Sequence, residues 1–322
     1  MRCLLLVLLA VGAALALELH RERWGGMFDS YTSRGDAGLT VLVVCGIHGR
    51  ELITQQLCER WLEELDGMPE RDDGVEPPRI IMVPAYNEAG LAIAGGRHAP
   101  PPADAGVRPT ATGAEDAGPP GGTKPPNTSC WRGNRMRVDL NRNWPHLPFR
   151  SLPPADPMDE AWGGPAPLSE PETRMMKRLL EERRPTIVLA VHSGTLAIMP
   201  PYDCTDHVKP PNYQQHVRFA NWLRAGICDD CVLARSTHLM YPALGTLTDY
   251  AYWEVAHLAL TLEVWGNSAL GADFATADCA ALFNPPAHEK QAVLDKWAPL
   301  ILRLATMHAD DMAALQAQQQ KY

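Results

Sequence analysis

The 322-residue sequence predicts an α/β fold in which a mixed, mostly parallel twisted sheet carries helices on both faces. Four short apolar runs, rich in β-branched residues, have the composition of buried strands. Longer segments between and after these runs repeat their apolar residues with the period of an amphipathic helix. No internal repeat and no linker divides the chain into two cores, so we expect a single domain.

The order of the predicted elements favours parallel strands joined by helical crossovers, because strands and helices alternate along the chain. The predicted strands cover residues 40–44, 79–85, 186–191 and 258–264. The predicted helices cover residues 51–65, 169–184, 212–228 and 287–318. Pro84 interrupts the second strand. Pro185 ends the second helix, and Pro299 is a candidate kink in the last.

The N-terminal residues 1–16 have the composition of a secretory signal peptide. Arg2 supplies a positive charge, residues 4–9 form an apolar core, and the Ala-Leu-Ala at 14–16 fits a cleavage site. The apolar run is too short for a comfortable membrane span, and no later stretch supplies one. We therefore expect a secreted or lumenal protein whose mature chain, residues 17–322, forms the single domain.

Two other segments lack the apolar residues of a core. Residues 17–39 are polar and rich in Gly, so we expect at most one short strand there. Residues 95–126 are dominated by Pro, Gly and Ala and are predicted to form a disordered surface loop. A glycosylation sequon, Asn127-Thr128-Ser129, follows this loop and suits an extracellular surface.

The overall charge of the protein argues against one class of partner, nucleic acid. A net charge of −9 and an isoelectric point near 5.7 argue against nucleic acid, whose phosphates attract basic surfaces. A mildly acidic surface is compatible with basic peptides. We expect a monomer.

Seven cysteines remain once the predicted signal peptide is removed. An odd number in an oxidising compartment leaves at least one free thiol or an intermolecular bond. Cys45 directly follows the first predicted strand, and we expect it to be the buried free thiol. Cys228 and Cys231 have a spacing found at zinc sites, but no second pair matches them. A local disulfide, or separate pairings, is favoured over a metal there.

Side chains that can bind a metal or move a proton stand at the ends of three predicted strands. His48 and Glu51 follow the first strand, and His192 follows the third. Glu263 lies near the end of the fourth. The carboxyl ends of strands are where open α/β sheets build their sites, and two His with one Glu is a common catalytic zinc set that leaves one position for water. A carboxylate on an apolar strand is costly to bury, and Glu263 suits a general base.

Four motifs in this order make the chain resemble the zinc metallocarboxypeptidases, the funnel-shaped family related to carboxypeptidases A, B, N and E. The resemblance covers residues 38 to 264. The motifs are Gly46-Ile47-His48-Gly49-Arg50-Glu51, Asp139-Leu140-Asn141-Arg142-Asn143, Val191-His192-Ser193 and Leu260-Thr261-Leu262-Glu263. The resemblance implies that residues 17–322 form a zinc carboxypeptidase-like catalytic domain. With one Zn²⁺ per chain, it would remove the C-terminal residue of peptides or proteins.

The resemblance also implies roles for the residues of the metal centre. His48, Glu51 and His192 would ligate zinc. Asp139 would hold the second ring nitrogen of His48 and so fix its tautomer. Glu263 would take a proton from water and pass it to the departing amine.

Other matching residues would hold the substrate. Asn141 and Arg142 would bind its terminal carboxylate, because a guanidinium fork suits bidentate contact, and this anchor would explain removal of the last residue only. Arg132 would polarise the scissile carbonyl group and stabilise its developing charge. Arg135 and Arg137 are competing candidates for that role.

The sequence says less about which C-terminal residue is released. Tyr241 precedes Glu263 by 22 residues, as the family's substrate-capping tyrosine does. Asp203, in Pro201-Tyr202-Asp203, resembles the pocket carboxylate of basic-specific members, so we expect a preference for Lys or Arg. Thr248 stands where pancreatic-type members carry their selecting residue, and it is neither an acid nor a large apolar floor. The alternative is that Asp203 caps a turn beside a permissive pocket.

Two other functions remain open for this sequence. A related zinc amidase or deacylase, acting on a non-peptide or cell-wall substrate, would use the same metal centre. The pair Asn141 and Arg142 argues for the exopeptidase without excluding the amidase. A catalytically dead binding homologue would be expected to lose a metal ligand or Glu263, and none is lost here.

Overall fold

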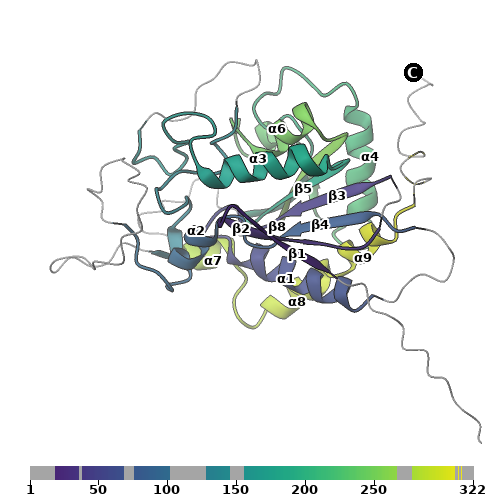
Figure 1. Ribbon diagram of the computed structural model, residues 1–322, viewed down its shortest axis with the longest axis horizontal. Coiled ribbons are helices and arrows are strands. Elements are labelled where there is room, and N and C mark those ends of the chain that lie inside the picture. The colour runs from purple at the N-terminus through teal and green to yellow at the C-terminus, as the bar shows by residue number, and fades with distance from the viewer. Residues whose placement is uncertain are drawn as a thin grey trace, which may run out of the picture.

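The computed structural model contains a mixed sheet flanked by helices (Figure 1). The described residues are 19–35, 38–68, 76–101, 128–145, 156–266, 278–308, 311 and 313. The predicted signal peptide lies outside them, as do positions 102–127, which hold most of the predicted loop and the sequon asparagine. Within the described ranges, no helix is both long enough and apolar enough to cross a membrane.

In this part of the chain, eight strands form one sheet in the order β1-β2-β4-β3-β5-β8-β6-β7. The strands are β1 (His20–Trp24), β2 (Phe28–Thr32), β3 (Thr40–Val44), β4 (Arg79–Val83), β5 (Ile187–His192), β6 (Thr195–Met199), β7 (Val232–Leu233) and β8 (Leu258–Trp265). The central strands β4, β3, β5 and β8 run parallel, and they are the four that the sequence predicts. Strands β2 and β6 join them antiparallel. The predicted mixed, mostly parallel sheet is confirmed.

Helices cover both faces of this sheet, as predicted. They are α1 (Leu52–Asp66), α2 (Glu88–Ala94), the 3₁₀ turn η1 (Thr128–Cys130), α3 (Pro171–Arg183), α4 (Tyr213–Arg224), α5 (Ser236–Leu239), α6 (Leu247–Glu254), α7 (Cys279–Phe283), α8 (Lys290–Trp297) and α9 (Pro299–Ala305). Figure 1 shows α1, α8 and α9 on one side of the sheet and α3 and α6 on the other. Pro299 separates α8 from α9, because proline cannot donate the hydrogen bond that would continue α8.

Alternation along the central strands divides the core into two layers. Val41 and Val43 point into a cluster formed with α1, α4, α8 and α9, whereas Leu42 and Val44 point into a cluster formed with α3 and α6. Each such side chain contributes about 1.5–3 kcal/mol through burial. Two buried indoles of the first layer are hydrogen-bonded, since Trp297 donates to the carbonyl oxygen of Val264 at 3.0 Å and Trp61 donates to that of Trp297 at 2.9 Å. Burial on both faces explains why these strands read as continuous apolar runs.

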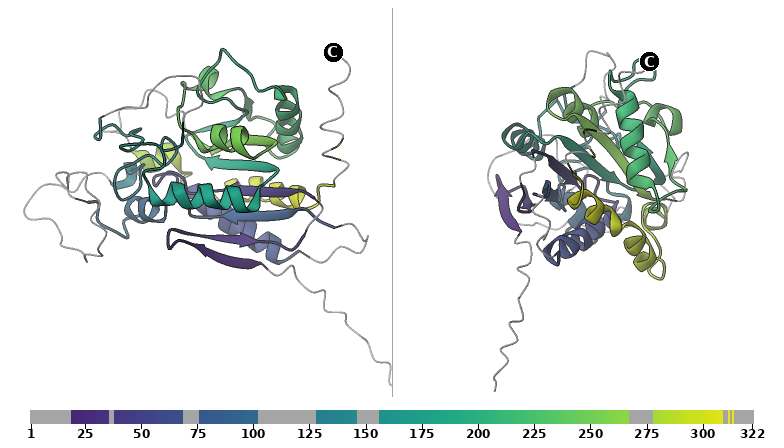
Figure 2. Two further views of the ribbon diagram at one scale, coloured as in Figure 1. Left: turned by 45° about the horizontal axis from the view of Figure 1, so that its top comes forward. Right: turned by 90° about the vertical axis from the view of Figure 1, so that its right-hand side faces the viewer.

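The prediction for residues 17–39 is wrong, because they form a hairpin of two strands, β1 and β2. Figure 2 shows this hairpin, in purple, at the edge of the molecule. An edge strand buries few side chains, and β1 exposes most of its own. Trp24 and Phe28 turn inward at the tip, while Arg21 pairs with Asp29 across the strands at 2.7 Å. A strand of this kind lacks the apolar run that marks a central strand.

The cysteine prediction is also corrected. Among the described residues, the disulfides are Cys45–Cys58, Cys130–Cys279 and Cys228–Cys231, and the free thiol is Cys204. Cys45 is therefore not the free thiol, because α1 packs back against β3 and brings Cys58 to it, with 6.3 Å between the Cα atoms. Cys228 and Cys231 form the local disulfide that the sequence left as one of two alternatives.

His216 fastens α4 to the sheet. Its Nε2 accepts the backbone N–H of Ala259 in β8 at 3.2 Å, and its ring meets that of Tyr252 edge to face. Burial lowers the pKa of His216 to about 4; the carbonyl of Asn212 opposes this shift and His257 adds to it. The imidazole is therefore neutral in the folded protein at neutral pH.

The disulfides are expected to stabilise the fold according to the length of chain that each closes. Their cysteines are 149 residues apart for Cys130–Cys279 and 3 for Cys228–Cys231. Chain-entropy arguments give losses of about 5 and about 2 kcal/mol when the two bonds are removed by paired Cys→Ser substitution. Denaturant unfolding of both double variants measures the difference, and equal losses would contradict this account.

Protonation of His216 is expected to weaken the fold in acid. The unfolded chain binds a proton near pH 6.5 and the folded chain only near 4, so the free energy of unfolding falls by up to about 3 kcal/mol as the pH falls through that window. Unfolding of the wild type and His216→Gln, both in chelator, measures this. The stability advantage of the wild type should shrink as the pH drops from 7 to 4, and a constant difference would refute the assignment.

Candidate metal centre and substrate pocket

Three neighbouring parallel strands, β3, β5 and β8, end at the same edge of the sheet. The register pairs His192 at the end of β5 with Glu263 on β8, so both side chains leave the sheet side by side. After β3 the chain turns at Gly46, whose φ of 64° and close approach to Leu91 leave no room for a side chain. This turn carries His48 over the strand ends, where its imidazole meets that of His192.

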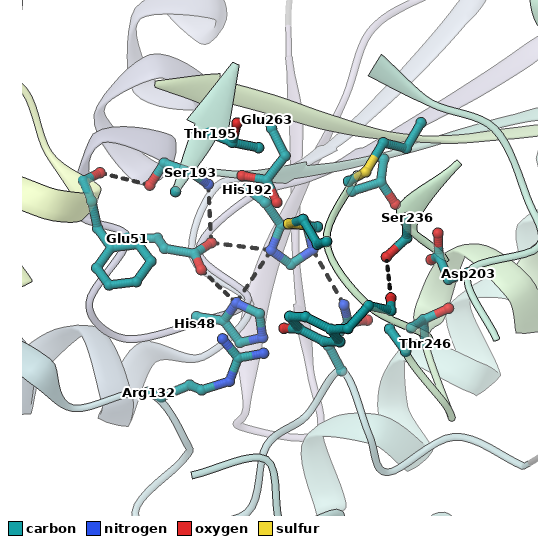
Figure 3. A pocket seen from close by; sticks show the side chains of 18 of the residues that line it. His48, Glu51, Arg132, His192, Ser193, Thr195, Asp203, Ser236, Thr246 and Glu263 are labelled. Atoms are coloured by element: carbon teal, nitrogen blue, oxygen red, sulfur yellow. Dashed lines mark hydrogen bonds and ion pairs between the residues drawn. The ribbon is translucent and has the colours of Figure 1, made fainter. Parts of the chain in front are cut away.

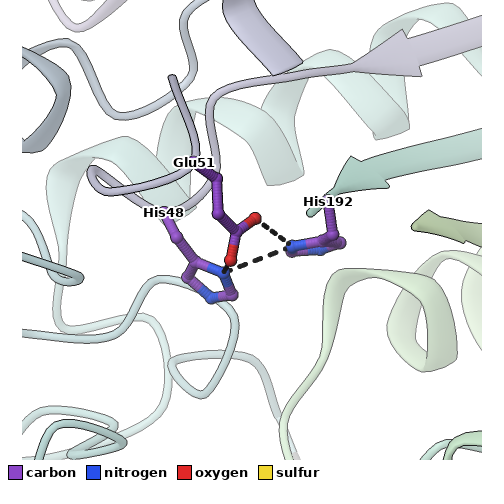
Figure 4. Close-up of side chains that lie close together, drawn as sticks. All are labelled: His48, Glu51 and His192. Carbon is purple, nitrogen blue, oxygen red and sulfur yellow. Dashed lines mark hydrogen bonds and ion pairs between the residues drawn. The ribbon is translucent and has the colours of Figure 1, made fainter. Parts of the chain in front are cut away.

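His48, Glu51 and His192 converge on one point (Figure 4), and each is at most 3% exposed. Their ligand atoms all lie within 4.8 Å of one another. The Nδ1 atom of His48 lies 2.6 Å from a Glu51 oxygen and 3.2 Å from Nδ1 of His192, which lies 3.0 Å from the other Glu51 oxygen. Two imidazole nitrogens and a carboxylate facing one another are the donor set of a metal centre such as zinc.

The electrostatics of the cluster favour the protonation states that bind a cation. Burial raises the pKa of Glu51, but His48 and His192 outweigh it and hold that pKa below its usual range. Burial lowers the pKa of His192, and the Glu51 charge only partly offsets this. The carboxyl group is therefore ionised and the His192 imidazole neutral, as metal ligation requires.

Asp139 supports the centre from behind. One of its oxygens lies 3.1 Å from Nε2 of His48, and the other accepts a hydrogen bond from Nε of Arg132 at 2.7 Å. Burial raises the pKa of Asp139, but Arg132 and His48 outweigh it and keep the group ionised. An ionised Asp139 holds a proton on Nε2 of His48 and leaves Nδ1 free to face the cluster.

Glu263 enters the pocket beside the metal cluster, near Thr195 and His192 (Figure 3). Its Oε2 atom is buried and has no hydrogen-bond partner among the residues that the structure describes. Burial and the Glu51 charge raise the pKa of Glu263 well above its usual value, and the backbone N–H of Thr195 only partly opposes them. A carboxyl group with a raised pKa and a free oxygen can accept a proton and give it back.

The predicted substrate-binding residues Asn141, Arg142 and Tyr241 line the same pocket, which has a volume of about 220 Å³. Arg142 donates from Nη1 to the carbonyl oxygen of Asn141 at 2.7 Å, and its Nη2 lies 3.4 Å from the hydroxyl of Tyr241. The Asn141 side chain is oriented by the N–H of Leu247, which its oxygen accepts at 2.9 Å. Tyr241 is 45% exposed, so it stands at the pocket mouth.

Of the three arginines considered for the scissile carbonyl group, Arg132 is the one that reaches the pocket. It lines the pocket and is fixed through Asp139. Of the two competitors, Arg137 lies over the ring of Trp131, and Arg135 lines a different cavity. Neither of them lines the pocket that holds the metal cluster.

The two residues linked to specificity lie at different depths. Asp203 lines the pocket across from the metal cluster, with Ser236 and Thr246 beside it (Figure 3). Thr248 does not reach the pocket, because its hydroxyl bonds that of Thr261 at 2.7 Å and Thr261 forms the wall in front of it. The structure therefore places Asp203 at the surface of the pocket and Thr248 behind it.

One group at the site escaped the sequence analysis. Arg50 is buried, pairs with Glu160 at 2.7 Å and stacks over the ring of Phe283 at 4.2 Å, and all three line the pocket. The position of Arg50 inside the first motif was the available signal. Nothing in the sequence links it to Glu160, which is 110 residues away.

Comparison with known proteins bears on the fold and on the family of the chain. The fold is similar to that of carboxypeptidase A from Helicoverpa armigera, with a TM-score of 0.65 and 18% identity over 92% of this chain and 70% of that chain. It is also similar to bovine thrombin-activatable fibrinolysis inhibitor, solved in complex with tick carboxypeptidase inhibitor, with a TM-score of 0.63 and 15% identity over 90% of each chain. No curated protein sequence matches the chain. A model of the peptidase M14 family, described as zinc carboxypeptidase, matches residues 21–296, and the chain therefore belongs to that family.

Proposed function

We propose that the protein is a secreted zinc carboxypeptidase that hydrolyses the C-terminal peptide bond of peptides or proteins, with a preference for C-terminal Lys or Arg. The observation that carries the proposal is the shared pocket. It joins a buried two-His, one-Glu cluster and the free carboxyl oxygen of Glu263 to a guanidinium at Arg142. A metal centre, a proton acceptor and a carboxylate anchor are the parts that this reaction needs.

The donor set fits zinc. His48, Glu51 and His192 would hold the ion, because they offer two imidazole nitrogens and a carboxylate within 4.8 Å of one another. When bound, zinc supplies Lewis-acid chemistry, which lowers the pKa of water and withdraws electron density from a carbonyl oxygen.

The chain's own residues would then orient the substrate and move the proton. Glu263 takes the proton from the attacking water and later delivers it to the departing amine. Arg132 stabilises the charge that develops on the scissile carbonyl oxygen. Its Nε–H is occupied by Asp139, so its two amino groups remain for that contact.

The remaining groups would select the end of the chain. Arg142 and Asn141 bind the terminal carboxylate, and Tyr241 at the pocket mouth closes over the bound residue. Within the described part of the chain, Asp203 has a buried oxygen without a hydrogen-bond partner, which a cationic side chain of the substrate would satisfy. The unpaired oxygen of Asp203 therefore favours a substrate that ends in Lys or Arg over one that ends in a large apolar residue.

The cellular setting is part of the proposal. The composition of residues 1–16 supports secretion, and so do the disulfides, which persist in oxidising compartments. The enzyme would act as a monomer on peptide or protein C-termini, with a glycan on Asn127.

Zinc binding is expected to depend on Asp139. One zinc per chain should bind the wild type, and Asp139→Asn should weaken affinity about 10–100-fold, since the orienting carboxylate of a ligating histidine is lost. Competition with a chromophoric chelator measures the affinity. Asp159→Asn, an exposed change nearby, is the matched control. Equal affinity in wild type and Asp139→Asn would refute this role.

Release of the last residue from paired peptides ending in Arg and in Phe tests the function. We expect faster release of Arg, and we expect Glu263→Gln to lower kcat about 10²–10⁴-fold while zinc stays bound. Asp203→Asn should reduce the Arg-to-Phe ratio of kcat/KM more than it reduces cleavage of the Phe peptide. Preference for Phe would refute the Asp203 assignment, and cleavage of neither peptide by the zinc-loaded protein would favour an amidase.

A further inference from the structure

A second buried carboxyl group, Asp249, lies directly against the segment that carries Asp203. Both residues are only 3% exposed. Asp249 sits in the first turn of α6, where its own N–H is capped by the hydroxyl of Thr246. One of its oxygens accepts the backbone N–H of Asp203 at 2.8 Å, and the other accepts that of Cys204 at 3.1 Å. Asp249 therefore fixes the backbone of Asp203 and brings a second carboxyl group beside it.

The two carboxyl groups are unequally supported. Asp249 receives two backbone hydrogen bonds, which favour its ionised form. Asp203 receives a hydrogen bond from the Thr246 side chain, but its buried Oδ1 atom has no hydrogen-bond partner among the described residues. Two like charges in one buried site repel strongly, so the second ionisation of such a pair is disfavoured. The first negative charge therefore falls on Asp249, and Asp203 is the group that keeps a proton.

The surrounding charged groups do not remove this asymmetry. Arg142 is the nearby cation and works to ionise both carboxyl groups. Glu263 on β8 adds repulsion from the other side of the pocket. The Cys204 thiol stays neutral, because burial and Asp249 raise its pKa above the physiological range.

We propose that Asp203 and Asp249 together carry one negative charge in the empty pocket, with a proton held on Asp203, and that a cationic C-terminal side chain releases that proton to solvent when it binds. Asp249 is then a positioning residue that sets the pH above which the enzyme prefers a basic residue. The inference rests on the proposed function, since it concerns the pocket that selects the last residue.

The titration behaviour of the pair is consistent with this assignment. Burial, followed by the Asp249 charge, raises the pKa of Asp203 well above its usual value. Burial raises the pKa of Asp249 to about 6, against the opposing effect of its backbone hydrogen bonds. An arginine side chain stays charged throughout, so the pH dependence comes from the pocket and not from the ligand. Binding of the cation should weaken as the pH falls, because the proton competes with it.

The ratio of kcat/KM for peptides ending in Arg and in Phe, measured from pH 5 to 9, tests the proposal. Arg142 and the metal serve both peptides, and so does Glu263, whose titration therefore cancels in the ratio. In the wild type the ratio should rise with pH, up to about tenfold per unit, until Asp203 is fully ionised. The variant Asp249→Asn keeps an acceptor oxygen but removes the charge. In this variant the ratio should rise at a pH that is lower by at least about one unit. Asp206→Asn removes an exposed carboxyl group from the same segment, retains both buried ones and should not move that pH.

Proton release provides a second measurement that needs no variant. Calorimetry of L-arginine binding to the zinc-loaded wild type at pH 7, in buffers of different ionisation enthalpy, should show about one more proton released than with L-phenylalanine. Equal proton release by the two ligands would overturn the proposal, as would a ratio that is flat with pH or unmoved by Asp249→Asn. Failure of the proposed function looks different, because neither peptide would be cleaved while the calorimetry still reports on the pair.

Discussion

The carboxylate of Asp139 is the constraint on which the rest of the site depends. It is completely buried and contacts His48 on one side and Arg132 on the other. A buried charge is tolerated only when it is paired, and here each partner carries a separate task. The same ion therefore fixes the ring orientation of a metal ligand and the direction of the guanidinium that would face the substrate.

The pocket also contains carboxyl groups that the fold leaves unsatisfied. Glu263 and Asp203 each have a buried oxygen without a partner. Such groups cost about 1–3 kcal/mol each, so a fold selected for stability alone would remove them. Under the proposed function, the substrate would satisfy both groups: Glu263 through the proton that it transfers, and Asp203 through a cationic side chain. The stability lost at these positions is offset by the two large apolar layers around the sheet.

Disulfides tie the walls of the site to the core. Cys45–Cys58 joins the end of β3 to α1, on either side of the turn that carries His48 and Glu51. Cys130–Cys279 joins the segment that carries Arg132 to α7, whose last residue, Phe283, packs on Arg50. These covalent links restrict the motion of the segments around the pocket in addition to the hydrogen bonds that hold them.

Much of this protein could be predicted from its sequence, because the strongest signals are local. The central strands are buried on both faces and so appear as apolar runs, and the metal ligands follow them within a few residues. The β1–β2 hairpin was missed because an edge strand needs no such run, and Cys45 was misassigned because its partner is presented by a helix that folds back on it. These errors concern contacts that a linear pattern does not contain.

The sequence by itself determined the sheet class and the identity of the candidate metal ligands, through apolar periodicity and the order of four motifs. Only the tertiary structure decided which polar groups share an environment. It placed Asp249 against Asp203, Glu160 against Arg50 and Thr248 behind Thr261. The reason is physical: burial and charge coupling depend on distances in space between residues far apart in the chain, and those distances exist only after the sheet has brought the strand ends together.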